Sequence, residues 1–369
     1  MANWKYVKIG DVCTVERGGS PRPIDKFITD DPNGINWIKI GDTDDSMYII
    51  KTAQKIIPEG MKKSRYVQPG DFLLSNSMSF GRPYILKIDG CIHDGWLVLR
   101  DNDGIFDKRF LYYYLSAPST YQKFKNMAVG GVVNNLNSEM VRGVTVPVPT
   151  MEEQLNIVVT LDKVTELITL RKEQLAKQDQ LVKSRFIELF GDPITNSNNL
   201  PTERMELRFN LKAGITTAAD DIHEFEEGMY EIPCYGGNGI RGYVREKSYT
   251  GNYPIIGRQG ALCGNVQYAT GEFHATEHAV LVSLLKNDNS VWVYHLLKLM
   301  DLFRYHTGAA QPGLAVKTLN TVEVIVADKR KQDQFAAFVE QTDKSKLAIQ
   351  QSLEKLELLK KSLMQEYFG

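Results

Sequence analysis

Two patterns in the sequence have the spacing of cofactor-binding or catalytic motifs. The first, Gly237-x-Gly239-x-x-Gly242, matches the dinucleotide fingerprint, which must follow a strand and open a helix so that the pyrophosphate meets the helix N-terminus. Here the glycines are followed by Tyr243-Val244-Arg245 and then by a Tyr-Thr-Gly-Asn-Tyr-Pro run at 249–254, which is typical of strands and turns. We therefore interpret this motif as a glycine-rich hairpin or recognition loop.

The second pattern, His274-x-x-Glu277-His278, matches the inverted zinc-protease motif, in which two histidines one helical turn apart hold zinc and the glutamate acts as a base. The apolar run at 279–282 that follows it predicts a buried strand. In a strand, positions 274 and 278 lie about 13 Å apart, which is too far to share a metal. A zinc hydrolase using these three residues remains an alternative hypothesis.

The cysteines of the chain give no sign of a metal or redox site. Cys13, Cys91, Cys234 and Cys263 are scattered singly, and no CxxC pair is present. Cys91 and His93 stand two residues apart on one expected strand, where packing of the thiol in the core is the simpler interpretation. We predict a reduced, cytoplasmic protein.

Other catalytic signatures are absent from the sequence. It has no Asn-Pro-Pro-Tyr-like tetrapeptide that grips a flipped adenine, no Phe-x-Gly-x-Gly cofactor loop, no Walker loop and no Asp with Glu-x-Lys nuclease cluster. The sequence therefore predicts a chain that does no chemistry and has neither a cofactor nor a metal of its own.

Polar, glycine-containing loops recur at similar places in the two halves of the chain, at 17–21 and 75–82 and again at 235–241 and 257–265. Glycine lets a backbone approach a ligand closely, and Arg, Asn, Gln and Ser are side chains that read base edges in DNA. Each loop taken alone is also compatible with an ordinary surface turn. The candidate base contacts are Arg17, Ser20, Asn76, Ser77 and Arg82 in the first half, and Asn238, Arg241, Arg258, Gln259 and Thr276 in the second.

The chain also contains an internal repeat. Residues 130–191 align without a gap on residues 308–369, at a constant offset of 178 (308 − 130 and 369 − 191). Leu136 meets Leu314, Gln154 meets Gln332, and both segments end in Phe-Gly. A period this long is not that of a solenoid and implies two copies of a large unit.

Each repeat predicts a short strand followed by a long helix. Valines alternate at 144, 146 and 148 in the first copy, and Thr150 and Glu153 then have capping-box spacing. Neither proline nor glycine interrupts residues 151–190, which corresponds to roughly 60 Å of helix. Apolar residues repeat every three or four positions in both helices, as in a coiled coil. The residues expected to pair the helices or dock a partner are Ile157, Leu161, Ile168, Leu175, Phe186, Phe335, Ile349, Leu353, Leu356 and Leu363.

The most economical arrangement packs the two helices against each other in antiparallel fashion; the alternative is that each packs on its own globular domain. We predict an α+β protein in which two mixed α/β domains are separated by a coiled-coil spacer, with a pseudo-twofold internal repeat. The expected divisions are 1–149 (first domain), 150–191 (first helix), 192–327 (second domain) and 328–369 (second helix). No apolar run approaches the roughly eighteen residues of a membrane helix.

In this order of elements the chain resembles the specificity subunit of Type I restriction-modification enzymes. The residues that carry the resemblance are Trp37-Ile38-Lys39-Ile40-Gly41-Asp42, Gly257-Arg258-Gln259-Gly260, Val146-Pro147-Val148-Pro149 running into Glu153-Gln154, Ile157 and Leu161-Asp162, and Phe190-Gly191-Asp192-Pro193. The second copy departs from the pattern, with Ile325 and Ala327 in place of the two prolines and Lys331-Gln332 in place of the Glu-Gln pair. Its contact with a partner is therefore expected to differ.

The resemblance implies a non-catalytic DNA-recognition subunit in which each domain reads one half of a split, asymmetric double-stranded site. It further implies two methyltransferase subunits that dock on the spacer and bring S-adenosylmethionine, with restriction and translocase subunits joining through them. A 60 Å spacer limits the domain separation to roughly eighteen base pairs. The net charge of −1 fits a reader whose partners neutralise the phosphates. A coiled-coil scaffold that spaces two binding modules without DNA is the other interpretation.

Overall fold

A computed structural model describes residues 4–76, 81–128, 135–260, 262–308 and 312–369. The chain divides into two compact units, the first made of Met1–Leu170 and Leu353–Gly369 and the second of Arg171–Ser352. Each long helix thus contributes one part to each unit, whereas the domains expected from the sequence end where the helices begin. No helix among the described residues combines the length and hydropathy of a membrane span.

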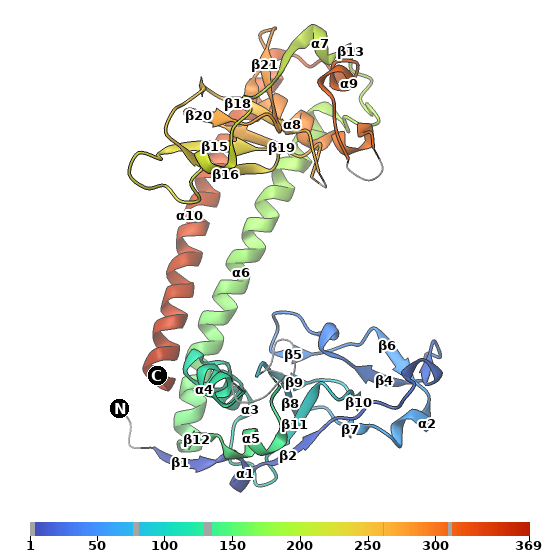
Figure 1. The fold of residues 1–369 in the computed structure, drawn as a ribbon, viewed down its shortest axis with the longest axis vertical. Coiled ribbons are helices and arrows are strands. Elements are labelled where there is room, and N and C mark those ends of the chain that lie inside the picture. The colour runs from blue at the N-terminus through green and yellow to red at the C-terminus, as the bar shows by residue number, and fades with distance from the viewer. Residues whose placement is uncertain (1–3, 77–80, 129–134, 261, 309–311) are drawn as a thin grey trace. The chain divides into compact units, whose positions relative to one another are not determined.

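Three sheets form the scaffold of the first unit (Figure 1). A two-stranded antiparallel pair joins β1 (Lys5–Lys8) to β12 (Thr145–Val148). One five-stranded sheet has the order β2 (Thr14–Arg17), β11 (Trp96–Arg100), β8 (Phe72–Ser75), β9 (Pro83–Leu86), β5 (Tyr48–Ile49). The other has the order β3 (Ile28–Thr29), β6 (Gln54–Ile56), β4 (Ile35–Ile38), β10 (Gly90–Ile92), β7 (Arg65–Val67).

Strand β11 shows why the sequence reads Trp-Leu-Val-Leu. Successive side chains of a strand point to opposite faces of the sheet. Leu97 and Leu99 pack in the core that also contains residues of the helices, while Trp96 and Val98 pack in a second core shared with β4 and β10. Both faces are buried, so the run is apolar throughout. The helices of this unit outside the long ones are α1 (Ile9–Val12), α2 (Pro58–Met61), α3 (Lys108–Ser116), α4 (Pro118–Ala128) and α5 (Ser138–Gly143).

The second unit repeats this scheme. Strand β13 (Thr202–Arg204) pairs with β22 (Glu323–Ile325), and a four-stranded sheet has the order β14 (Phe209–Ala213), β21 (Ala279–Leu284), β18 (Tyr253–Gly257), β19 (Val266–Ala269). A second has the order β16 (Gly239–Val244), β15 (Ile232–Gly236), β20 (Glu272–Ala275), β17 (Tyr249–Thr250). Helices α7 (Met205–Arg208), α8 (Ser290–Leu299) and α9 (Val316–Asn320) complete it.

A parallel strand pair marks the corresponding place in the two copies. Cys91 of β10 lies opposite Trp37 of β4, and Cys234 of β15 lies opposite His274 of β20. The repeat that the sequence showed only over its last third therefore extends through the globular parts.

The long helices α6 (Met151–Phe190) and α10 (Lys329–Phe368) contain 40 residues each. The expected capping box opens α6, since the backbone N–H of Thr150 donates to Glu153 Oε2 at 2.8 Å and that of Glu153 donates to the Thr150 hydroxyl at 3.3 Å. In the first unit, Leu161 near the start of α6 shares a core with Phe368 at the end of α10. These contacts pair the start of one helix with the end of the other.

In the second unit the opposite ends meet. Phe186 near the end of α6 packs edge-on against Phe335 near the start of α10, with ring centroids 5.3 Å apart, and Lys346 pairs with Asp179 at 2.6 Å. The antiparallel pairing is thus confirmed within each unit. The buried members of the expected pairing set are Ile157, Leu161, Ile168, Phe186, Phe335 and Leu353, and the half-buried members are Leu175, Ile349, Leu356 and Leu363.

Candidate nucleic-acid interface

In the first unit, three predicted contact residues converge on Asp94, in the turn between β10 and β11. Arg17, the last residue of β2, donates from Nε to the Asp94 carbonyl oxygen at 3.0 Å. The side-chain amide of Asn76, which follows β8, donates to the same carbonyl at 2.8 Å. The Ser20 hydroxyl donates to Asp94 Oδ1 at 2.8 Å. Residues from two separate loops, 17–21 and 75–82, therefore meet at one turn.

The Asp94 carboxylate is ionised at neutral pH. Burial raises its pKa, but the hydrogen bond from Ser20 and the charge of Arg22 are among the causes that outweigh this effect and leave the pKa below its usual value. Arg22 Nη2 lies 3.3 Å from Asp94 Oδ2, and the two side chains are 80% and 44% exposed. The site therefore presents a carboxylate as well as cations to solvent.

The neighbouring His93 is held in the neutral state. Its Nε2 faces the backbone N–H of Ile40 at 3.2 Å, and its Nδ1 faces the backbone N–H of Gly95 at 2.6 Å. Burial is the main cause that lowers the pKa of this imidazole. A neutral ring can accept one hydrogen bond, at the nitrogen that carries no proton, whereas an imidazolium can accept none. The imidazole therefore contacts the backbone on both sides of the ring and adds no positive charge to the site.

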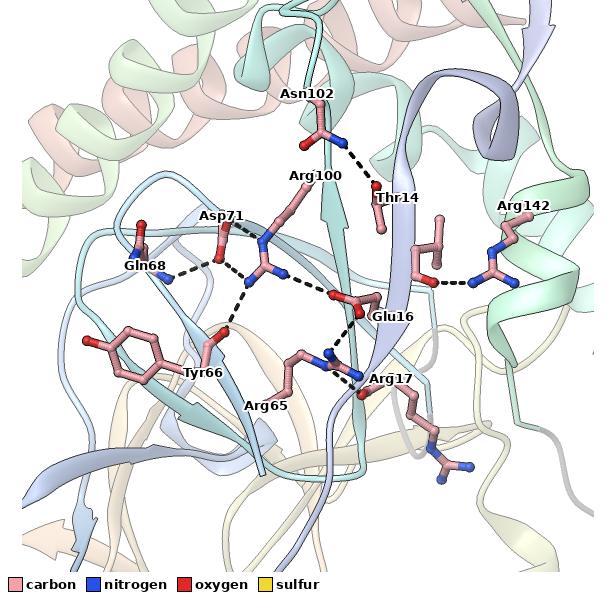
Figure 2. Close-up of polar contacts among 11 residues, drawn as sticks. Thr14, Glu16, Arg17, Arg65, Tyr66, Gln68, Asp71, Arg100, Asn102 and Arg142 are labelled. Carbon is pink, nitrogen blue, oxygen red and sulfur yellow. Dashed lines mark hydrogen bonds and ion pairs between the residues drawn. The ribbon is translucent and has the colours of Figure 1, made fainter. Parts of the chain in front are cut away.

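A network of ion pairs fixes the strand that carries Arg17 (Figure 2). Arg100 pairs with Asp71 at 2.8 Å and with Glu16 at 3.0 Å. Arg65 pairs with the same Glu16 at 2.7 Å and donates to the Arg17 carbonyl oxygen at 3.3 Å. Figure 2 shows the Arg17 guanidinium pointing away from this network. The side chain is exposed, so its terminal amino groups face solvent.

The other residues predicted in the first half lie differently. Asn76 is buried, at 1% exposure, with its amide engaged by Asp94. Arg82 is 45% exposed and pairs with Asp45 at 3.0 Å, away from the Asp94 turn. Ser77 lies outside the described residues. The structure thus brings Arg17, Ser20 and Asn76 together, whereas Arg82 contacts a different loop.

Backbone hydrogen bonds establish which residues of the two copies correspond. The N–H of Asn76 donates to the Gly95 carbonyl at 2.9 Å, and that of Arg258 donates to the His278 carbonyl at 3.0 Å. The carbonyl oxygen of each residue also accepts from a leucine of the repeat. The backbone N–H of Leu136 donates to the Asn76 carbonyl at 2.9 Å, and that of Leu314, which aligns with Leu136, donates to the Arg258 carbonyl at 2.8 Å. Two residues predicted independently as base contacts therefore occupy the same position.

The same register places Glu277 where the first copy has Asp94. Its Oε2 accepts from the backbone N–H of Thr217 at 3.2 Å, and its Oε1 lies 3.2 Å from His278 Nε2. The Glu277 side chain is 32% exposed. Each unit therefore holds a partly exposed carboxylate in the turn that precedes its buried apolar strand, β11 in the first unit and β21 in the second.

In the second unit Asn238, Arg241, Arg258 and Gln259 lie on two touching loops, and Thr276 lies in the turn between β20 and β21. A Cβ on Gly257 would lie only 2.0 Å from the Gly237 carbonyl oxygen, so glycine is required where these loops meet. Among the predicted residues, Asn238, Arg241 and Gln259 are exposed, Arg258 is half-buried and Thr276 is fully buried. Within the described part of the chain, the Arg258 Nε and the Thr276 hydroxyl have no hydrogen-bond partner.

The glycine motif has the hairpin structure that the sequence analysis favoured, whereas the histidine motif lies only partly in the expected strand. The glycines of Gly237-x-Gly239-x-x-Gly242 lie in the β15–β16 hairpin, with no helix after them. His274 is on strand β20, with its ring between the hydroxyls of Thr217 and Ser248. Glu277 and His278 follow in a turn. No group of three potential metal ligands occurs among the residues that the structure describes, and the zinc hydrolase has no support in this geometry.

Sequence reasoning did not identify Asp94 as a candidate, and it considered Glu277 only as a zinc-site base. A usable signal was nonetheless present, because each residue precedes the buried apolar strand of its copy, β11 or β21. The turns before β11 and β21 correspond in the two copies, and side chains from several loops can meet at such turns.

Comparison with known proteins gives a consistent result. The family described as Type I restriction modification DNA specificity domain matches residues 1–178 and 209–359. The chain is 30% identical over 362 residues to the Type I restriction enzyme EcoprrI specificity subunit of Escherichia coli, covering 92% of this chain and 87% of that protein. It is 26% identical over 193 residues to the Type I restriction enzyme MjaIX specificity subunit of Methanocaldococcus jannaschii, covering 51% and 43% of the two chains.

Solved structures show the same fold. The crystal structure of the Type-I restriction-modification system S subunit from M. genitalium matches with a TM-score of 0.62 at 17% identity, covering 100% of this chain and 96% of that one. A structure described under complex assembly and conformational transition of the type I R-M system matches with a TM-score of 0.62 at 16% identity, covering 99% and 97%.

Proposed function

Since the chain belongs to the family of Type I restriction-modification DNA specificity subunits, which recognise DNA sequence and are not themselves catalytic, we propose that it reads a two-part, asymmetric double-stranded site. Each unit would read one half of the site. The observation that carries this proposal is the shared frame of the two units, in which Asn76 and Arg258 make the same backbone hydrogen bonds.

The frame is the same but its side chains differ. An amide stands at position 76 and a guanidinium at the corresponding position 258. In the major groove a guanidinium is suited to guanine, whereas the Asn76 amide is buried and donates to the Asp94 carbonyl oxygen. Two copies with one backbone arrangement and different side chains would recognise two different half-sites, so the complete site would not be palindromic.

The paired helices support an unread gap of fixed length between the half-sites. Both α6 and α10 contain residues of both units, and they pair in antiparallel fashion within each. A 40-residue helix is about 60 Å long, which sets an upper limit of roughly eighteen base pairs on the spacing. The gap would be a property of the helices and not of the loops.

We further propose that methyltransferase subunits carrying S-adenosylmethionine dock on this chain, and that restriction and translocase subunits join through them. An apolar row on the first turns of α6 supports a docking surface: Met151, Leu155 and Val159 are 42%, 39% and 61% exposed at a spacing of four residues. The net charge of −1 also favours partners that supply the contacts to phosphate.

The test is genome-wide mapping of adenine methylation in cells that express the partner methyltransferase with and without this chain. The expected result is one two-part motif with a fixed gap and unequal halves that appears only when the chain is present. A palindromic or contiguous motif would contradict the two-unit arrangement. A methylation pattern that does not depend on the chain would favour the scaffold interpretation.

A further inference from the structure

The recognition site of each unit contains a carboxylate that the proposed function does not yet explain. Around Asp94, the side chains of Arg17, Ser20 and Asn76 all act as hydrogen-bond donors. A carboxylate at a DNA-facing surface is repelled by the phosphates. We therefore expect a partly exposed carboxylate at this surface to make a favourable interaction that offsets the repulsion by the phosphates.

Base recognition can supply such an interaction. In the major groove, guanine offers acceptors, which arginine reads, whereas cytosine N4 and adenine N6 are amino groups that donate. Arginine cannot accept a hydrogen bond from these amino groups, whereas the carbonyl oxygen of a side-chain amide can. An ionised aspartate or glutamate, which only accepts, is suited to them.

The Asp94 carboxylate has room for another donor. Its Oδ1 accepts from the Ser20 hydroxyl at 2.8 Å, and its Oδ2 lies 3.3 Å from Arg22 Nη2. Two carboxylate oxygens offer about four acceptor positions in total. The Asp94 side chain is 44% exposed, and Arg22, at 80% exposure, is only loosely held. Ser20 therefore orients the carboxylate while its remaining lone pairs face solvent.

The second unit retains the carboxylate while its surroundings differ. Glu277 corresponds to Asp94, although Arg258 replaces Asn76 and His278 replaces Gly95. The backbone N–H of Thr217 orients Glu277 Oε2 at 3.2 Å, a role comparable to that of Ser20 in the first copy. The side chain is 32% exposed. The acidic residue is thus the shared element of two otherwise different surfaces.

We propose that Asp94 and Glu277 are specificity-determining residues, each of which accepts a hydrogen bond from the exocyclic amino group of a cytosine or an adenine in the half-site that its own unit reads. This inference rests on the proposed function. It adds a group that can only accept to a predicted set made of arginine, amide and hydroxyl side chains.

The experiment uses the complete complex with the partner methyltransferase and a DNA library in which both half-sites are randomised. The variants are Asp94→Asn and Glu277→Gln, which preserve shape but replace a pure acceptor with an amide, together with Asp94→Ala. Exposed acidic residues of the same units provide matched controls, Asp103→Asn and Glu226→Gln. Methylated products are sequenced, and thermal unfolding of each variant is measured in parallel.

We expect Asp94→Asn to lose discrimination at one cytosine or adenine position of one half-site by roughly 10- to 100-fold, with the other half-site unchanged. Glu277→Gln should do the same in the opposite half-site, and the controls should match the wild type. Asp94→Ala should relax the same position as Asp94→Asn.

Two results would overturn the inference. One is an unchanged motif in Asp94→Asn and Glu277→Gln, and the other is an equal loss of methylation at every position of both half-sites. A wild-type complex that methylates no two-part motif would overturn the proposed function as well, whereas an intact wild-type motif with unchanged variants overturns this inference alone.

Discussion

The side-chain carbonyl of Gln154 accepts a hydrogen bond from the backbone N–H of Asp107, 2.9 Å away, at the N-cap of α3. The second copy repeats this contact, because Gln332 accepts from the backbone N–H of Asn289, the N-cap of α8, at 2.8 Å. Both glutamines are buried. A residue that the family resemblance places beside a partner contact therefore ties the first turn of each long helix to its own globular unit.

The substitution Gln154→Ala is expected to lower the free energy of unfolding by about 1–3 kcal/mol, because it leaves buried backbone groups unpaired. Besides the Asp107 contact, the Gln154 amide donates to the carbonyl oxygens of Ile105 at 2.9 Å and Pro149 at 3.1 Å. Urea unfolding checks this expectation. Gln180→Ala, at an exposed position of the same helix, should change stability by less than about 0.5 kcal/mol. Equal effects of the two substitutions would contradict the structural role of Gln154.

Two glycines are required where strands approach the recognition turns. A Cβ on Gly18 would lie 2.1 Å from the His93 carbonyl oxygen, and one on Gly214 would lie 2.2 Å from that of Ala275. Each alanine substitution should destabilise its own unit by about 1–3 kcal/mol and disturb the turn that holds the carboxylate. Methylation mapping should show loss of one half-site per variant. Gly41→Ala is the control, since no atom lies within 4 Å of its added Cβ; a comparable loss there would argue against the steric explanation.

The second unit contains a buried ion pair between Arg208 and Asp288, with contacts of 2.6 Å and side-chain exposures of 9% and 3%. Arg208→Met should cost about 3–5 kcal/mol, because it leaves the carboxylate without its cation. The double variant with Asp288→Leu should recover most of this loss, since neither charge is then buried. Hydrogen exchange of α8 measures both effects.

An exposed arginine of the same unit provides the comparison. Arg204 is 60% exposed and lies 3.6 Å from Glu206. Arg204→Met should change stability by less than about 1 kcal/mol. If the double variant at 208 and 288 were no more stable than the single one, the buried pair would not be the source of the loss.

The stability of the second unit should depend on pH through His295. Burial, helped by the nearby charges of Lys298 and Lys346 and opposed by Asp179, lowers the pKa of His295 to about 4 from an ordinary value of 6.5. The unfolded chain therefore takes up a proton below pH 6.5, while the folded chain does so only near pH 4. The contribution is complete above pH 6.5 and is lost as the pH falls towards 4.

At pH 5 this difference amounts to about 2 kcal/mol. Urea unfolding of the wild type and of His295→Gln at pH 7.5 and pH 5 measures it, because the pH dependence shared with other groups cancels between the two proteins. The wild type should lose about 2 kcal/mol more than the variant on acidification. Parallel losses in both proteins would show that His295 is not the group responsible.

Arg258→Ala should relax one position of one half-site at a cost of about 1–3 kcal/mol in binding free energy. Arg258 corresponds to Asn76 of the other unit and is half-buried, so its guanidinium has limited freedom. Gel shifts on single-base variants of the mapped site, with the methyltransferase present, give the measurement. If the variant kept the wild-type base preference at every position, Arg258 would not be a base contact. A uniform loss of affinity for all sites, with only the salt dependence altered, would lead to the same conclusion.

Local patterns were sufficient to predict the long elements of the fold. The offset of 178 residues, the Thr150–Glu153 spacing and the absence of proline and glycine from 151 to 190 predicted two copies and a capped helix, and the structure confirms them. These predictions succeed because helix periodicity and caps act between residues close in sequence. The strand predicted across residues 274–278 was wrong in its second part, because β20 ends at Ala275 and Glu277 and His278 lie in a turn.

The composition of the recognition site depends instead on contacts between distant residues. Arg17 reaches the carbonyl oxygen of Asp94 from 77 positions away, and Asn76 reaches it from a different loop and is buried in doing so. No periodicity or spacing encodes this meeting, because the pairing of β2 with β11 and of β10 with β4 brings these strand ends together. The sequence by itself determined the repeat, the helices and the candidate loops. Only the tertiary structure decided that Asp94 and Glu277 occupy corresponding turns of the two units, since long-range strand register sets which residues correspond.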